Sequence, residues 1–124
     1  MGLVYVALIH FLAPNGPGGL KAFAGEPHDD LMTAENHITQ EGDALISRRW
    51  MPDIMGPAFF RQHLKDKTRR VDYWLRSRWD PPGSMSLDVG VTYTGQPESE
   101  GLRGLGTHVI TPEDERSTHY FYAL

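Results

Sequence analysis

The chain has 124 residues, the size of one small domain, so we expect residues 1–124 to form a single domain. It contains no cysteine, which excludes a disulfide scaffold, a thiol nucleophile and a cysteine-ligated iron–sulfur cluster within the chain. With 12 basic and 16 acidic residues the formal charge is −4, and this balance disfavours a nucleic-acid partner.

The N-terminal part has a mixed character. Residues 1–9 are apolar, but a membrane span needs about 18 such residues, and no basic segment precedes them as in a signal peptide. We therefore expect a buried first element, no membrane association and a cytoplasmic location. Residues 13–19 and 25–30 are rich in glycine and proline and predict loops. The pattern does not assign a fold to residues 1–30.

Short alternating runs from residue 31 onward predict strands. Residues 31–39 and 44–51 flank a glycine-containing turn and predict a hairpin, with Pro52 ending its second strand. A short helix is expected over residues 58–65, after Gly56-Pro57. Four further strands are expected at residues 71–79, 85–93, 102–111 and 117–124. This order predicts an α+β fold built on a curved antiparallel meander with few short helices.

The expected strands have one apolar and one polar face. Val71 and Tyr73 alternate with Asp72 and Trp74, and the same alternation continues along the next strand. Arg76 and Arg78 lie on the polar face, where we expect a cross-strand salt bridge rather than anion binding. An apolar sheet face needs cover, yet no helix follows it in this chain. Either another subunit covers the sheet or the chain is a piece of a longer protein.

Residues 107–121 carry the most specific motif of the chain. It consists of Thr107-His108-Val109-Ile110-Thr111-Pro112-Glu113-Asp114-Glu115 followed by His119-Tyr120-Phe121. Its order and spacing resemble the catalytic domain of Rieske non-heme iron aromatic-ring oxygenases, in the branch of the vanillate O-demethylase and dicamba monooxygenase oxygenase components. Upstream segments resemble the same domain in the same order: Arg49-Trp50-Met51, Val71-Asp72-Tyr73-Trp74, Arg78-Trp79-Asp80-Pro81 and Met85-Ser86-Leu87-Asp88. The resemblance covers residues 31–124 well and residues 1–30 poorly.

The resemblance implies a helix-grip fold, in which a curved antiparallel sheet closes over a long C-terminal helix around a ligand cavity. This chain would end before that helix. The implied chemistry is mono- or dioxygenation or O-demethylation of a small aromatic compound at mononuclear Fe(II), with electrons from a Rieske [2Fe–2S] cluster.

The residues that the resemblance would assign to iron are mostly missing. His10 is a weak candidate for one histidine ligand, but Asn15 stands where the second histidine is expected and Ala7 where an aspartate is expected. A Rieske cluster is impossible without cysteine. We therefore expect this chain to support neither cofactor by itself and to be inactive alone, and the sequence leaves open whether it counts as an enzyme.

The resemblance also suggests two substrate-binding residues. His108 matches a histidine that hydrogen-bonds an acidic substrate in dicamba-type members, and Asp88 matches a pocket asparagine. We expect His37 and His63 to be ordinary surface residues and His119 to be structural. The loop His28-Asp29-Asp30 is not expected to bind a metal, because adjacent loop residues point in different directions.

Two functions of other classes stay open. The chain could be a non-enzymatic helix-grip module that binds a small aromatic or apolar ligand, or a homo-oligomeric interaction domain whose open sheet pairs with another copy. We expect a homo-oligomer in each case, because an uncovered apolar sheet face must be buried.

Overall fold

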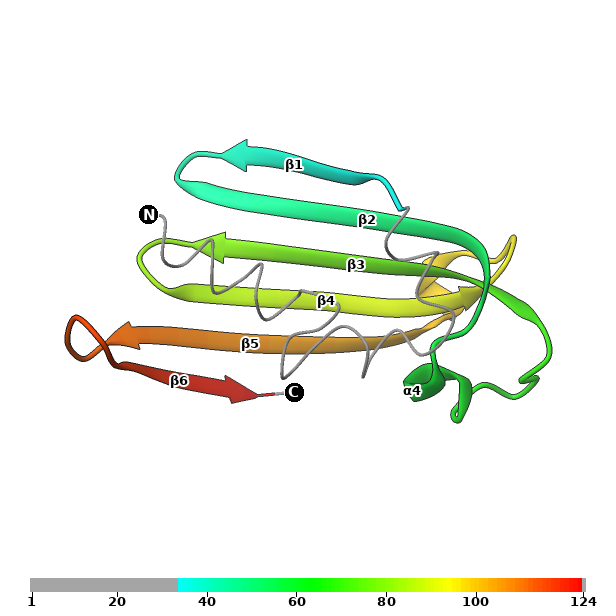
Figure 1. The fold of residues 1–124 in the computed structure, drawn as a ribbon. Coiled ribbons are helices and arrows are strands. Elements are labelled where there is room, and N and C mark those ends of the chain that lie inside the picture. Colours follow the sequence, from blue (N-terminus) through cyan, green and yellow to red (C-terminus); the bar gives the residue numbers. More distant parts are fainter. Residues whose placement is uncertain (1–33, 124) are drawn as a thin grey trace.

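The computed structural model describes residues 34–123, which form a six-stranded antiparallel sheet in the order β1-β2-β3-β4-β5-β6 (Figure 1). The strands are β1 (Asn36–Glu41), β2 (Ala44–Met55), β3 (Arg70–Asp80), β4 (Ser84–Tyr93), β5 (Leu102–Pro112) and β6 (Thr118–Ala123). The predicted meander, with almost no helix, is therefore confirmed. The expectations for His10 and for the loop His28-Asp29-Asp30 lie outside the described residues.

Strand β2 runs further than the sequence predicts. Its pairing with β3 shifts register between Met51 and Ile54, and Asp53 between them has a φ of 52°. Such a bulge leaves positions outside the hydrogen-bond ladder, so the missing N–H of Pro52 costs no ladder bond there. The prediction that Pro52 ends the strand is wrong for this reason.

Helix α4 (Ala58–Arg61) is one turn long, shorter than the predicted helix over residues 58–65. The next backbone bonds, from His63 N to Phe60 O (2.9 Å) and from Leu64 N to Arg61 O (3.3 Å), connect residues three apart and tighten the chain into a turn. Phe60 is 3% exposed and packs in the core. The helix lies at one end of the sheet (Figure 1).

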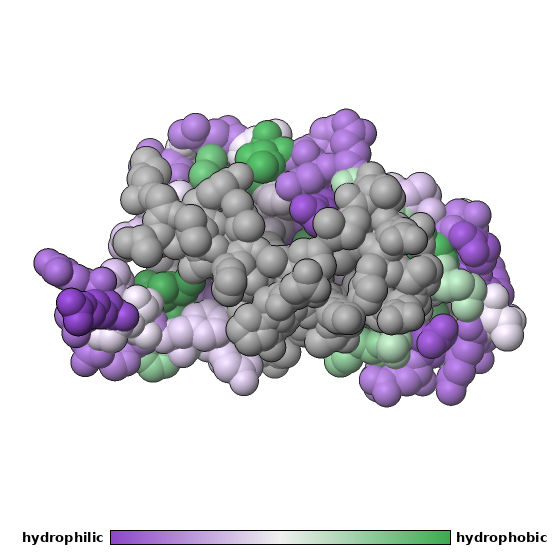
Figure 2. All heavy atoms as spheres, in the orientation of Figure 1, coloured by the Kyte–Doolittle hydropathy of each residue, from purple (hydrophilic) through white to green (hydrophobic). Residues whose placement is uncertain are grey.

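The two faces of the sheet differ in what covers them. We call the face that packs against α4 the helix face; it carries Val71, Tyr73, Val89 and Val91, all 5% exposed or less. Paired residues of neighbouring strands lie on the same face, so Trp74, paired with Gly90, belongs to the opposite face. The predicted alternation along β3 and β4 is confirmed. Hydrophilic residues gather at both ends of the sheet, over the connections between strands (Figure 2).

Candidate functional site

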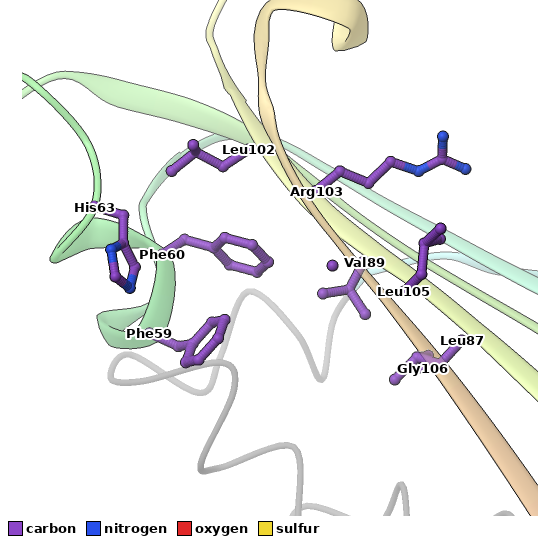
Figure 3. Close-up of a pocket in the computed structure, with 10 residues that line it drawn as sticks. Phe59, Phe60, His63, Leu87, Val89, Leu102, Arg103, Leu105 and Gly106 are labelled. Atoms are coloured by element: carbon purple, nitrogen blue, oxygen red, sulfur yellow. The ribbon is translucent and has the colours of Figure 1, made fainter. Parts of the chain in front are cut away.

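A cavity of about 410 Å³ lies on the helix face, between α4 and strands β4 and β5 (Figure 3). Phe59 and Phe60 point from the helix turn toward Val89 on the sheet (Figure 3). The lining residues are Phe59, Phe60, His63, Leu87, Val89, Leu102, Arg103, Gly104, Leu105 and Gly106. By register, Arg103 and Leu105 belong to the opposite face of β5, and the other sheet residues of this lining belong to the helix face. The lining is mostly apolar and aromatic. The volume of the cavity lies within the range of about 300–1,000 Å³ that is typical of sites for one small molecule.

Two glycines line this cavity on the side of the sheet. Gly104 and Gly106 lie on the helix face of β5, paired with Val89 and Leu87 of β4. Among residues 34–123, the nearest atom to a Cβ atom built on Gly104 would be the carbonyl oxygen of Val89, at 4.0 Å. The family resemblance implied a ligand cavity, but the sequence did not indicate which residues line it. The sequence signal for this lining is a pair of glycines two residues apart on one strand, next to a row of apolar residues on the neighbouring strand.

His108 lies on the helix face of β5, two residues after the cavity-lining Gly106, which is on the same face. It pairs with Met85 of β4 and is 5% exposed. Its Nδ1 atom is 2.5 Å from the hydroxyl of Tyr120 on β6, and the two rings stack with centroids 5.8 Å apart. Burial lowers the pKa of His108, so at neutral pH the imidazole is uncharged. It can act as a hydrogen-bonding group but not as a cation.

This pKa shift predicts a pH dependence of stability. A histidine whose pKa is lowered by folding contributes full stability above its unfolded pKa of about 6.5, and loses it as the pH falls below that value. We expect the free energy of unfolding to decrease between about pH 7 and pH 5, and His108→Gln to remove part of that decrease. Urea denaturation at each pH measures it. The same replacement at His119, which is exposed, serves as the control; an equal effect there would contradict the prediction.

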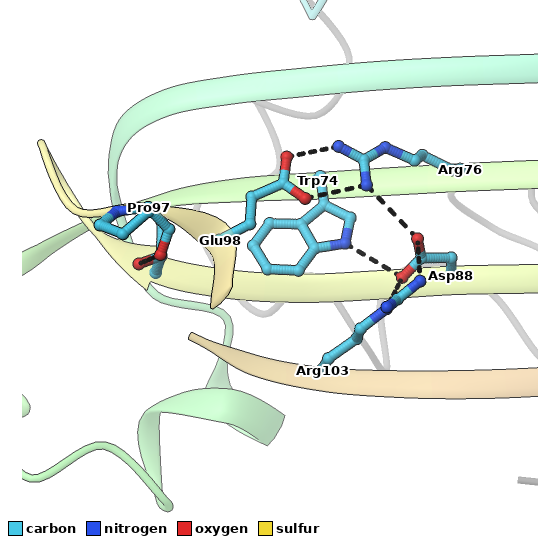
Figure 4. A network of polar contacts seen from close by, with 7 residues as sticks. Trp74, Arg76, Asp88, Pro97, Glu98 and Arg103 are labelled. Atoms are coloured by element: carbon cyan, nitrogen blue, oxygen red, sulfur yellow. Dashed lines mark hydrogen bonds and ion pairs between the residues drawn. The ribbon is translucent and has the colours of Figure 1, made fainter. Parts of the chain in front are cut away.

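Asp88 lies on the opposite face of the sheet, where it is held by three side chains (Figure 4). Arg103 donates to it from Nε (2.8 Å) and Nη2 (3.0 Å), and Trp74 donates from Nε1 (3.2 Å). Burial opposes ionisation of Asp88, but hydrogen bonds from Arg103 and Trp74 and the charges of Arg103 and Arg76 outweigh it. The pKa of Asp88 is therefore lowered, and the group is a fixed anion.

Arg76 connects this carboxylate to a second one. It is 3.4 Å from Asp88 across the strand pair β3–β4, and it also pairs with Glu98 in the short 3₁₀ helix Glu98–Glu100. The predicted cross-strand salt bridge is confirmed for Arg76. Arg78 bonds to Asp80 on its own strand, at 2.9 Å, and also forms a cross-strand ion pair with Glu41 of β1, at 3.6 Å, so the prediction is confirmed for Arg78 as well.

The sheet thus separates the two residues suggested as substrate-binding. Met85, the partner of His108, and Leu105, the partner of Asp88, lie on different faces. The two side chains do not line one cavity. Only His108 shares the face of the cavity, while Asp88 has its hydrogen bonds within a charged network.

The other histidines take different places. His63 is exposed as expected, but it also lines the cavity, with its ring 6.1 Å from that of Phe59. His37 is 3.4 Å from Glu35, and His119 is 3.6 Å from Glu113. Both are exposed on the sheet.

Residues 34–123 include no group of three histidine, cysteine or acidic side chains placed to hold a metal ion. The described residues therefore do not fit a mononuclear iron centre, and a chain without cysteine does not fit a Rieske cluster. Within the same part of the chain, no helix is long and apolar enough to cross a membrane.

The described part of the chain is thus a meander sheet with an apolar cavity against one face and a buried neutral histidine on that face. Residues 20–124 match the family model of the vanillate O-demethylase oxygenase C-terminal domain. The chain belongs to this family, and the resemblance seen in the sequence is confirmed.

Two relatives illustrate the match. The oxygenase component of chloroacetanilide N-alkylformylase from Rhizorhabdus wittichii is 37% identical over 94 residues, covering 76% of this chain and 27% of the relative. The vanillate O-demethylase oxygenase subunit of a Pseudomonas species is 31% identical over 93 residues, covering 68% of this chain and 26% of the relative. The chain thus spans only about a quarter of the length of these relatives.

Solved structures agree with the fold. A crystal structure of dicamba monooxygenase bound to 3,6-dichlorosalicylic acid aligns with a TM-score of 0.72 at 23% identity, over 97% of this chain and 32% of that chain. A second one, with non-heme iron and dicamba, aligns with a TM-score of 0.61 at 26% identity, over 71% of this chain and 27% of that chain.

Proposed function

We propose that this chain forms the sheet wall of the substrate cavity in a Rieske-type oxygenase that acts on a small aromatic compound. The observation that carries the proposal is the 410 Å³ apolar cavity on the same sheet face as the neutral His108. Phe59 and Phe60 offer edges and faces to an aromatic ring, and such pairs are favourable beyond the area that they bury. The relatives are named for substituted aromatic compounds, which supports the substrate class.

In this proposal His108 binds an oxygen of the substrate. Tyr120 is the better acid of the bonded pair and an imidazole nitrogen the better base, so the hydroxyl donates to Nδ1 and the proton of His108 lies on Nε2. An Nε2–H group is a hydrogen-bond donor for an oxygen acceptor. Asp88 instead positions β3, β4 and β5 relative to one another through Trp74 and Arg103.

Filling the cavity is expected to weaken ligand binding. Gly104→Leu places a side chain into the cavity, because a Cβ atom there has room. We expect the Kd for 3,6-dichlorosalicylic acid, used as a probe, to rise at least about tenfold, measured by calorimetry. Thr107→Leu puts the same side chain on the exposed opposite face of β5 and should leave the Kd unchanged. Equal Kd values for both variants and the wild type would argue against this cavity as the site.

We further propose that the iron and cluster ligands lie outside residues 34–123, and that the chain binds ligand without oxidising it. Support comes from the missing cysteines and from Asn15 and Ala7 at the positions discussed above. Purified protein incubated with Fe(II), a reductant and dioxygen should bind the probe but give no oxidised product. Stoichiometric iron together with product would refute this part of the proposal.

We propose the helix-grip architecture for the complete domain, with further cover on the helix face. Tyr120 and Tyr122 on that face of β6 are 40% and 68% exposed, which leaves apolar surface for a covering element. A solved structure of a longer chain with this sheet would test it: a helix packed on β6 is expected, and solvent there would contradict it.

A second candidate function is self-association through the opposite face of β5 and β6. Leu105, Val109 and Phe121 are 61%, 38% and 60% exposed there, a patch that a second copy would bury. Light scattering should then give a mass that rises with concentration. A monomer at every concentration would exclude this function and the expected homo-oligomer.

A further inference from the structure

Strand β2 carries a bulge shortly before helix α4. Two residues, Pro52 and Asp53, oppose the single residue Asp72 of β3. Asp53 has a φ of 52°, in the left-handed region that residues other than glycine disfavour. Such a conformation persists only where neighbouring groups hold it, and strained residues of this kind gather at binding sites. The bulge is therefore a candidate for a functional element.

Two side chains of β3 hold this bulge. Asp72 accepts a hydrogen bond from the backbone N–H of Asp53, with its Oδ1 atom at 2.9 Å. Arg70 donates from Nε to the carbonyl oxygen of Asp53 (2.8 Å) and to its Oδ1 atom (2.9 Å), and from Nη2 to the same carbonyl oxygen. The ion pair itself contributes little, because both side chains are more than half exposed. The bonds to the backbone N–H and carbonyl of Asp53 are what fix the bulge.

The bulge decides which face of the sheet Ile54 occupies. In a regular strand Met51 and Ile54, which are three residues apart, would lie on opposite faces. The extra residue brings both side chains to the helix face, where they are 3% and 8% exposed and belong to the same core cluster as Phe60 of α4. Bulges often re-aim a side chain in this way beside a binding site.

The connection from the bulge to α4 is short and closely packed. Only Gly56 and Pro57 lie between the end of β2 and the start of α4. A Cβ atom on Gly56 would be in van der Waals contact with the side chains of Leu64 and Val71, at 3.4 and 3.5 Å. The direction in which the chain leaves the bulge therefore sets where the aromatic residues of α4 that line the cavity stand above the sheet (Figure 3).

We infer that Arg70 and Asp72 are positioning residues: by holding the bulge at Asp53 they set the height of α4 above the sheet, and with it the size of ring that the cavity accepts. Neither side chain lines the cavity, so both act through α4 and not through contact with a ligand. The inference rests on the proposed function and adds the residues that determine selectivity for ligand size. A wall that is held in place favours a ligand that fills the cavity, because less ordering is needed on binding.

Two probes of one chemistry and different size test this inference, namely salicylic acid and 3,6-dichlorosalicylic acid, which carries two additional chlorine atoms. Arg70→Met keeps the length of the side chain but removes its donors. The Kd for the larger probe should rise about fivefold and the Kd for the smaller one less than about twofold, because the larger ring needs both walls of the cavity. A lower free energy of unfolding with an unchanged ratio of the two Kd values would show a merely structural role and overturn the inference.

Two matched comparisons accompany this variant. Arg69→Met changes the neighbouring arginine, which lies over the ring of Tyr93 and forms no hydrogen bond or ion pair with the bulge, so the ratio should stay at its wild-type value. Asp72→Asn retains an oxygen that can accept from the N–H of Asp53 and should keep the wild-type ratio, whereas Asp72→Ala should change it as Arg70→Met does. Equal ratios in Asp72→Asn and Asp72→Ala would overturn the inference.

A measurement without ligand separates the inference from the proposed function. The rings of Phe60 and Tyr73 have centroids 6.1 Å apart, so nuclear Overhauser effects should connect them in the wild type. These effects should weaken in Arg70→Met, because α4 moves, and persist in Arg69→Met. Unchanged effects in Arg70→Met would overturn the inference and leave the proposed function intact. If the wild type binds neither probe while the effects weaken, the proposed function fails and the positioning of α4 by the bulge is supported.

Discussion

Gly90→Ala is expected to lower the free energy of unfolding by about 3 kcal/mol, measured by urea denaturation. Gly90 lies on the opposite face of β4, where the Trp74 ring packs directly on its Cα atom. An added Cβ would overlap the ring, with Cε2 at 2.7 Å, and the carbonyl oxygen of Leu102 at 2.5 Å. Trp74 is 1% exposed and hydrogen-bonded to Asp88, so neither the ring nor the backbone has room to move.

Gly104→Ala is the matched control for this prediction. It adds the same methyl group to the neighbouring strand, where the nearest atom of the described residues is 4.0 Å away. We expect the free energy of unfolding to change by no more than about 0.5 kcal/mol, because the added methyl group enters free space. Equal losses in the two variants would show that strand glycines matter for their backbone freedom and not for the contact with Trp74.

Asp88→Asn is expected to cost about 1.5 kcal/mol of stability at pH 7. The replacement keeps the shape of the side chain but removes the charge that Arg76 and Arg103 share. Because folding lowers the pKa of Asp88, its contribution is present above the ordinary pKa and is lost as the pH falls through the folded value. The difference between variant and wild type should therefore shrink toward pH 3, as denaturation at both pH values would show.

The control for this prediction is Asp80→Asn. Asp80 also bonds an arginine, Arg78, but both side chains are more than 40% exposed. Exposed ion pairs contribute about 0.2–1 kcal/mol, so the loss should be smaller than for Asp88. A larger loss at Asp80, or a loss at Asp88 that is the same at pH 3 and pH 7, would contradict the role given to the network.

Much of the sheet could be predicted because alternation is a local signal. Val71, Tyr73 and Val91 occupy the inward positions that period-two spacing assigns to them, and short turns make consecutive strands antiparallel neighbours. The continuation of β2 past Pro52 was missed because a bulge depends on the partner strand, which a local pattern does not include. Helix α4 was predicted too long because Phe60 and Leu64 reach the core from a turn as well as from a helix.

The site was harder to predict, because it depends on register between strands. His108 and Asp88 each lie on an identifiable strand, but the length of the connection decides which residues of β4 and β5 pair, and hence which face each occupies. The bonds from Arg70 and Asp72 to the bulge are likewise visible only once their neighbours are known.

Nuclear Overhauser effects can test whether an aromatic ligand lies on the helix face of this sheet. In the complex of this chain with 3,6-dichlorosalicylic acid, the ring protons of the ligand should show effects to the methyl groups of Leu87, Val89 and Leu102, which line the cavity. None should reach Val109, which faces the other way on β5. Effects to Val109 and none to Leu87 or Val89 would place the ligand on the wrong side of the sheet and contradict the account.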